Sequence, residues 1–160
     1  MNSQEGQQVI AGAGGIVDST NAKPWTEISK KYETVLKKDN KSVVIKTAGS
    51  TSVEKVLTAL IENFTVEAGN VQIQQNQTGS GDGHKRVLGA EKDGANAASI
   101  GFASRDFSSD EDVSKALVSG VICKDAVVVL VNAANPITNI TADQAKAIFG
   151  GTSKIWSDVK

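Results

Sequence analysis

Lys46-Thr47-Ala48-Gly49-Ser50-Thr51-Ser52-Val53 is the stretch that decides how the surrounding chain folds. The four residues before it, Ser-Val-Val-Ile at 42–45, are rich in β-branched side chains and predict a buried strand. After it, apolar residues recur at the spacing of one helix face, at Val53, Val56, Leu57, Leu60, Ile61 and Phe64. The sequence therefore predicts a strand, a tight turn at Gly49, and a helix capped by Ser50 or Thr51.

The predicted start of this helix has the chemistry of an anion-binding site. The first N–H groups of a helix have no backbone partner and lie at the positive end of the helix dipole. The hydroxyl groups of Ser50, Thr51 and Ser52 add further donors at the same place. An ordinary capped helix has the same local sequence, so this stretch alone does not distinguish the two interpretations.

Composition excludes several classes of function. The chain has 160 residues, of which 39% are hydrophobic and 22% charged, as in a globular domain with a core. A net charge of −1 and an aromatic content of 4% argue against nucleic acid or an anionic membrane surface as a partner. No apolar run approaches the roughly 18 residues of a membrane span. The polar start at Met1 is not a signal peptide, although a mature or truncated chain would begin in the same way.

The residues that usually carry metal binding or covalent catalysis are scarce. Cys123 is the only cysteine, so we expect no internal disulfide and no cysteine metal cluster, and interpret Cys123 as a small buried hydrophobe. His84 is the only histidine, so a metal site would lack a second imidazole and a surface role is favoured. Asp82 and Asp106 lie near the predicted turns, but no base is paired with a nucleophile. We therefore expect no metal, no cofactor and no catalytic residues.

Strand and helix patterns alternate along the rest of the chain. Helices are predicted over residues 4–13, 24–39, 85–92, 110–116 and 141–149, and strands over 71–75, 98–103, 118–122 and 126–131. This alternation predicts an α/β domain with a largely parallel sheet. Sheets of this kind bind ligands at the carboxyl ends of their strands.

Three of the predicted strands are followed by turns that carry serine. These turns are 49–52 (Gly-Ser-Thr-Ser), 79–81 (Gly-Ser-Gly), and Ser104-Arg105. The second lies in a glycine-rich segment that can direct backbone N–H groups toward a ligand, but its spacing fits neither a Walker motif nor a dinucleotide fingerprint. Three turns of this kind at one edge of a sheet, with one guanidinium, suit a small tetrahedral oxyanion.

These turns, in this order, resemble those of the phosphate-binding proteins of bacterial phosphate ABC transporters, which have the type 2 periplasmic-binding-protein fold. The resemblance extends from about Val43 to Val159. Its markers are AGSTSV at 48–53, GSGDG at 79–83, IGFASR at 100–105, the run 125–132, and the segment 137–159. Within the last segment, AIFGG at 147–151 and IWSDV at 155–159 are the most distinctive pieces.

The resemblance implies a three-layer αβα lobe with a mostly parallel sheet, and a binding role, not catalysis. In that family two lobes close on phosphate. The residues that match its phosphate ligands are Ser50, Thr51, Ser52, Ser80, Gly81, Ser104 and Arg105. Some members carry an aspartate at the position of Arg105, where it accepts a proton from the ligand. Selectivity for phosphate over sulfate is therefore less secure in this chain.

The resemblance also predicts how the chain is divided. Residues 1–132 are expected to form the first lobe of a phosphate-binding-protein-like domain, with 1–39 resembling the family's C-terminal return segment and 40–132 its N-terminal segment. Residues 133–160 are then the hinge and the start of a second lobe that is largely missing. A tandem-repeat protein cut across a repeat junction, or a rearranged chain, would produce this order.

For the full-length protein the resemblance implies phosphate transport with an ABC transporter membrane permease. It also implies a periplasmic or extracellular location and attachment to the membrane as a lipoprotein. Inorganic phosphate or a similar tetrahedral oxyanion is the expected ligand. An uncovered hinge strand at 127–131 would favour a homodimer formed by domain swapping. Two alternatives remain: a surface or adhesive module of the same fold without a transport role and, less favoured, an enzyme acting on phosphate esters.

Overall fold

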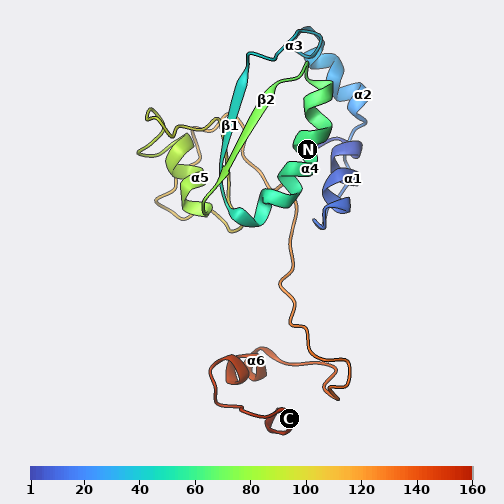
Figure 1. The fold of residues 1–160 in the computed structure, drawn as a ribbon, viewed down its shortest axis with the longest axis vertical. Helices are drawn as coiled ribbons and strands as arrows, with labels where there is room; N and C mark the ends of the chain where they lie inside the picture. The colour runs from blue at the N-terminus through green and yellow to red at the C-terminus, as the bar shows by residue number, and fades with distance from the viewer. Residues whose placement is uncertain (160) are drawn as a thin grey trace. The chain divides into compact units, whose positions relative to one another are not determined.

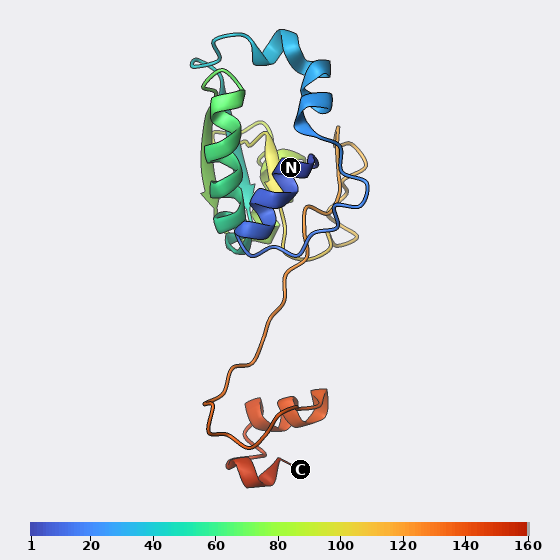
Figure 2. The same ribbon diagram turned by 90° about the vertical axis from the view of Figure 1, so that its right-hand side faces the viewer.

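The computed structural model describes residues 1–159 and divides into two compact units, Met1–Asp125 and Ala126–Lys160 (Figures 1 and 2). The first unit contains a three-stranded sheet in the order β2-β1-β3. The strands are β1 (Val44–Gly49), β2 (Gln72–Gln77) and β3 (Ile100–Phe102), and both neighbours of β1 run parallel to it. All three strands therefore end at the same edge of the sheet.

Helices lie on both sides of this sheet, as Figure 1 shows. On one side, α4 (Glu54–Glu67) packs on β2, and α1 (Gln4–Gly12) packs on α4. On the other side, α5 (Ser80–Val87) contacts β1 and β3. This arrangement confirms the predicted α/β fold class with a parallel sheet.

The core of the first unit is small and contains the apolar face predicted for α4. Its buried apolar residues are Ile10, Ala48, Leu57, Leu60, Ala68, Val71 and Phe102. Leu57 and Leu60 are the buried members of the helical stripe that follows the turn. Ala48 and Phe102 lie at or next to the carboxyl ends of β1 and β3, so the core directly supports the edge at which the strands end.

The helix predicted after Pro24 is not continuous. It is divided into α2 (Trp25–Ile28), the 3₁₀ helix η1 (Ser29–Tyr32), and α3 (Glu33–Leu36). Tyr32 and Val35 are 55% and 57% exposed, so these two apolar side chains gain little burial. Without tertiary packing, a helix of this length is only marginally stable.

The strands predicted over 118–122 and 126–131 and the helix predicted over 110–116 are wrong, since all three segments are irregular. A strand requires a neighbour for its backbone groups. In this region the described residues provide one bridge, between Ile16 and Lys124. In the predicted helix, the Asp112 carboxylate instead accepts a hydrogen bond from the Ser114 N–H at 2.8 Å, which favours a turn.

The second unit, considered by itself, contains α6 (Ala142–Phe149) and the 3₁₀ helix η3 (Trp156–Asp158). A capping box begins α6, because the Gln144 N–H donates to Thr141 Oγ1 at 3.2 Å and the Thr141 N–H donates to Gln144 Oε1 at 2.7 Å. None of the helices within residues 1–159 combines the length and apolar character needed to cross a membrane. The predicted assignment of segments to lobes stays a prediction.

Candidate anion-binding site

The ends of the three strands are joined by backbone hydrogen bonds. The Ser50 N–H donates to the Phe102 carbonyl at 3.0 Å, and the Gly79 N–H donates to the Gly49 carbonyl at 2.8 Å. Gly49 has a φ of +132°, and a Cβ at this position would lie 1.9 Å from the Phe102 carbonyl oxygen. Only glycine combines this conformation with so close an approach. The turn after β1 is therefore held against the end of β3.

Three serine hydroxyls from the three turns meet at this edge, and we call Ser50, Ser80 and Ser104 the hydroxyl cluster. Ser50 Oγ donates to Ser104 Oγ at 2.9 Å, and the Ser80 and Ser104 hydroxyl oxygens are 3.4 Å apart. The Ser104 N–H also donates to Ser80 Oγ at 3.2 Å. Ser50 is buried, Ser80 is half-buried and Ser104 is exposed. The cluster is thus anchored in the core and open to solvent on one side.

The start of α5 lies at the hydroxyl cluster. This helix begins at Ser80, whereas the sequence predicted a start at Lys85, and Gly79 provides no side-chain cap. A Cβ on Gly83 would lie 2.5 Å from the Phe102 carbonyl oxygen, and one on Gly101 would lie 2.2 Å from the Gly83 carbonyl oxygen. The two glycines therefore let α5 lie directly on β3. The N-terminus of α5, with the Ser80 hydroxyl on its first residue, therefore lies at the cluster.

The other predicted residues around Ser50 and Ser80 occupy different positions. Thr51 and Ser52 lie in the 3₁₀ helix η2 (Thr51–Val53) that precedes α4, and both are exposed. The Ser52 N–H donates to Ser50 Oγ at 3.2 Å, so Ser50 caps this element. Within residues 1–159, neither the Thr51 nor the Ser52 hydroxyl joins the cluster. Gly81, in the first turn of α5, is exposed and offers its backbone only.

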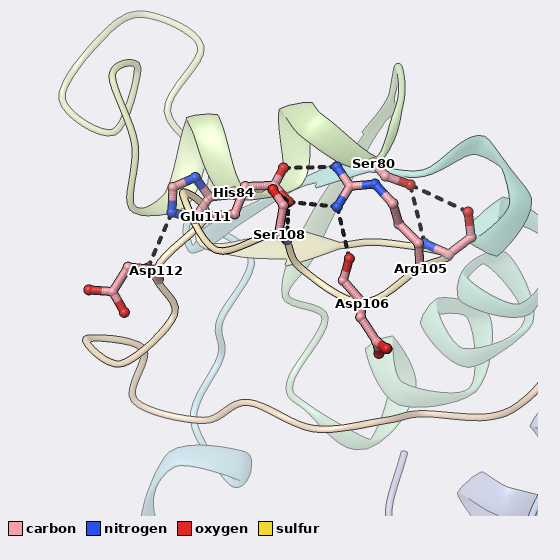
Figure 3. A network of polar contacts seen from close by, with 8 residues as sticks. Ser80, His84, Arg105, Asp106, Ser108, Glu111 and Asp112 are labelled. Carbon is pink, nitrogen blue, oxygen red and sulfur yellow. Dashed lines mark hydrogen bonds and ion pairs between the residues drawn. The ribbon is translucent and has the colours of Figure 1, made fainter.

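Arg105 follows the cluster directly but is held by a carboxylate, as Figure 3 shows. Its Nη1 and Nη2 donate to Glu111 Oε2 and Oε1 at 2.6 and 2.9 Å, and Nη1 also donates to the Asp106 carbonyl at 2.9 Å. Glu111 Oε2 additionally accepts from the Ser108 N–H at 2.9 Å and the Ser108 hydroxyl at 3.0 Å. Glu111 was not among the predicted residues. Its signal was the Ser-x-x-Glu spacing from Ser108, which is that of a capping box.

These contacts stabilise the charged forms of both partners. The Arg105 guanidinium and the Ser108 N–H lower the pKa of Glu111 from 4.5 to about 2, with the Arg105 hydrogen bond as the largest cause. The same hydrogen bond raises the pKa of Arg105 above its usual range. The Glu111 side chain is 11% exposed and that of Arg105 46% exposed. The pair is therefore fully ionised at neutral pH. Its carboxylate is largely buried, and its guanidinium is more exposed.

The contribution of Glu111 to stability should disappear in acid. Since its pKa in the folded chain lies below its unfolded value of 4.5, its contribution is present above that pH and is lost as the pH falls toward 2. Urea unfolding of the wild-type chain and of Glu111→Gln should therefore differ most above about pH 5 and converge below it. A difference in unfolding free energy that stays constant over this pH range would contradict the assignment.

Two of the side chains considered for metal binding or catalysis, His84 and Asp82, have other partners. His84 Nε2 lies 3.2 Å from the Asp112 carbonyl oxygen, and the His84 ring stands beside Phe107. Cys123 is half-buried, and burial raises the pKa of its thiol. Asp82 contacts the Thr78 hydroxyl. Among residues 1–159, no three His, Cys, Asp or Glu side chains are grouped in a way that could hold a metal ion.

Comparisons with known proteins identify the relatives of this chain. The family model described as "PBP superfamily domain" matches residues 21–160. The chain is 31% identical over 157 residues to the phosphate-binding protein PstS 2 of Streptococcus agalactiae serotype V, covering 98% of this chain and 47% of that protein. It is 27% identical over 160 residues to PstS 2 of Streptococcus pneumoniae serotype 4, covering 100% of this chain and 48% of that protein. The chain thus spans about half the length of the curated relatives it matches.

A solved structure shows the same fold. The crystal structure of a phosphate-binding protein of a phosphate ABC transporter from Streptococcus pneumoniae TIGR4 aligns with a TM-score of 0.78 at 26% identity. The alignment covers 99% of this chain and 55% of that protein.

Proposed function

The chain belongs to the PBP superfamily domain family, and on this basis we propose that it is the phosphate-binding lobe of a substrate-binding protein of a phosphate ABC transporter. The observation that carries the proposal is the hydroxyl cluster at the start of α5, where three parallel strands end. This is the edge at which open α/β sheets bind their ligands. The names of the relatives as phosphate-binding proteins support the same ligand.

The geometry explains how this edge would hold a tetrahedral oxyanion. Each hydroxyl of the cluster can rotate and donate to a ligand oxygen in place of its neighbour. In the first turns of η2 and α5, the backbone N–H groups of Thr51 and Gly81 would add the positive end of a helix, whereas that of Ser52 donates to Ser50 Oγ. Arg105 would supply the only full positive charge among the proposed ligands. Hydrogen bonds of this kind are strongest where water is excluded, so a lobe open on one side should bind weakly.

For the longer protein we extend the proposal to transport. It would act outside the cell membrane, in a periplasmic or extracellular location and anchored as a lipoprotein, and would deliver phosphate to the membrane permease of the transporter. It would bind its ligand without converting it. Residues 1–132 would form the first lobe, and residues 133–160 would begin the second. The exposed apolar side chains of Val127 and Leu130 support the proposed swapped homodimer, because such a segment favours pairing with another chain.

Calorimetric titration of the chain with phosphate and sulfate at low salt tests the proposed ligand. Phosphate should bind with a dissociation constant in the millimolar range or below, equivalent to about −4 kcal/mol or better. Because no carboxylate is among the proposed ligands to accept a proton from phosphate, sulfate should bind within about tenfold.

The outcomes of this titration and of one further assay separate the three candidate functions. A phosphate preference above about a hundredfold would show that a proton acceptor is part of the site. No heat with either anion would contradict binding by this lobe, and the same titration on the longer protein would then distinguish a missing second lobe from the adhesive module. A separate assay with phosphate esters tests the enzyme, which turnover of the esters would favour. Chloride at matched ionic strength controls for general charge screening.

A further inference from the structure

The contact between Arg105 and Glu111 leaves one specific side of the guanidinium available. An arginine side chain has five N–H bonds in a fixed plane. Glu111 accepts one hydrogen bond from Nη1 and one from Nη2, and the Asp106 carbonyl accepts the second hydrogen bond from Nη1. In the described part of the chain, the remaining two N–H bonds, on Nε and Nη2, contact no acceptor. These two are parallel and form the second, side-on fork of the guanidinium.

The available fork belongs to the residue that directly follows Ser104 of the hydroxyl cluster in the chain. The Ser104 N–H donates to Ser80 Oγ at 3.2 Å, which fixes the backbone at the root of the Arg105 side chain. In Figure 3 the part of Arg105 that carries Nε lies toward Ser80, and the Asp106 carbonyl lies below the guanidinium. A small oxyanion against Ser80 could therefore accept from the side-on fork while Glu111 keeps the other one.

The Glu111 carboxylate is held by several hydrogen bonds, so we do not expect an incoming anion to displace it from Arg105. Its Oε2 accepts from the Ser108 N–H and hydroxyl as well as from Arg105, and its side chain is only 11% exposed. Arg105 is 46% exposed, and by itself a side chain of this length would sample many rotamers. The better-buried carboxylate thus fixes the orientation of the more exposed cation.

We propose that Glu111 is a positioning residue that takes the end-on fork of Arg105 and thereby presents the side-on fork, Nε and Nη2, to the anion. This inference rests on the proposed function and names the N–H bonds that Arg105 would use. Positioning saves the ordering of a flexible side chain on binding, an effect of about tenfold in affinity. The opposing effect is the negative charge of Glu111, which repels the anion. Removing that charge alone should strengthen binding by only a few-fold near the surface.

A matched pair of variants separates positioning from charge. Asp110→Asn removes the same charge one residue away, and with it an electrostatic interaction with Arg105, but it keeps the hydrogen bonds of Arg105 to Glu111 and Asp106. This variant should therefore bind phosphate as tightly as the wild type or a few-fold more tightly. Glu111→Gln should bind about tenfold more weakly than Asp110→Asn. Glu111→Asp keeps the charge and shortens the reach, so it should also weaken binding. In an Arg105→Ala background, Glu111→Gln and Asp110→Asn should have equal effects.

The NMR signal of the Arg105 Nε–H provides a readout independent of affinity. It should be sharp in the wild type and in Asp110→Asn, broadened in Glu111→Gln, and shifted by added phosphate. The positioning role would be overturned if Glu111→Gln bound phosphate as tightly as Asp110→Asn. It would also be overturned if Glu111→Gln weakened binding as much in the Arg105→Ala background as in the wild type. The Nε–H signal could also be sharp in the wild type and broadened in Glu111→Gln but not respond to phosphate. That result would support the contact between Glu111 and Arg105 and contradict the proposed function.

Discussion

Replacing Ser50 and Arg105 together with alanine should abolish measurable phosphate binding while the chain remains folded. The change removes one hydroxyl of the cluster and the guanidinium. Hydrogen bonds to charged groups contribute roughly 1.5–3 kcal/mol each, so losing both should cost about 3–6 kcal/mol. That loss moves a millimolar dissociation constant beyond the range that calorimetry measures. Loss of the Ser50 cap should destabilise the fold by only about 1 kcal/mol.

A control variant with the same kinds of loss is available elsewhere in the chain. Ser3 is also a buried helix cap, 6% exposed, and its Oγ accepts from the Gly6 N–H at 2.9 Å. Ser3→Ala combined with Lys30→Ala therefore removes one capping hydroxyl and one exposed cation, and phosphate binding should not change. Undiminished binding in the Ser50→Ala, Arg105→Ala variant would place the anion elsewhere on the protein.

Gly49→Ala should destabilise the first unit by about 2–6 kcal/mol. A non-glycine residue at a φ of +132° costs roughly 1–3 kcal/mol. The added Cβ would also lie 1.9 Å from the Phe102 carbonyl oxygen, and relieving such a contact costs about 1–3 kcal/mol more. A typical domain is stable by only about 5–15 kcal/mol. Chemical denaturation followed by circular dichroism measures this change.

Gly12→Ala is the matched control for Gly49→Ala. Gly12 is the last residue of α1, and a Cβ there would meet no atom within 4 Å. Since alanine is a better helix former than glycine, this variant should be unchanged or more stable by up to about 1 kcal/mol. If Gly49→Ala were as stable as Gly12→Ala, the close approach of Gly49 to the Phe102 carbonyl at the end of β3 would be contradicted.

The sequence predicted the centre of the fold because the relevant signals there are local. The β-branched run before Gly49, the glycine itself and the stripe containing Leu57 and Leu60 identify a strand, a turn and a helix without reference to other parts of the chain. The buried strand predicted over 42–45 is nevertheless displaced, because β1 spans Val44–Gly49 and its buried residues are the last three, while Val43 and Val44 are exposed. Parallel strands then require that the three turns share one edge. The meeting of Ser50, Ser80 and Ser104 follows from that topology.

The sequence predictions were wrong or incomplete where the local structure depends on contacts with distant parts of the chain. The start of α5 was placed five residues late because Gly79, Gly81 and Gly83 are typical of a loop. In the structure, Gly83 is instead the residue that lets the helix lie on β3. The apolar runs at 118–122 and 126–131 have the composition of strands, but strand formation depends on pairing. Glu111 was missed because its partner Arg105 is fixed by the path of a loop.

The most direct test of the central claim is to map phosphate binding on the wild-type chain by amide chemical shifts. If the hydroxyl cluster and the start of α5 hold the anion, the N–H signals of Ser80, Gly81, Ser104 and Arg105 should shift and saturate at millimolar phosphate, while that of Gly12 stays in place. Saturable shifts confined to other residues, or no shifts at the cluster while the fold is intact, would contradict the assignment of this edge as an anion-binding site.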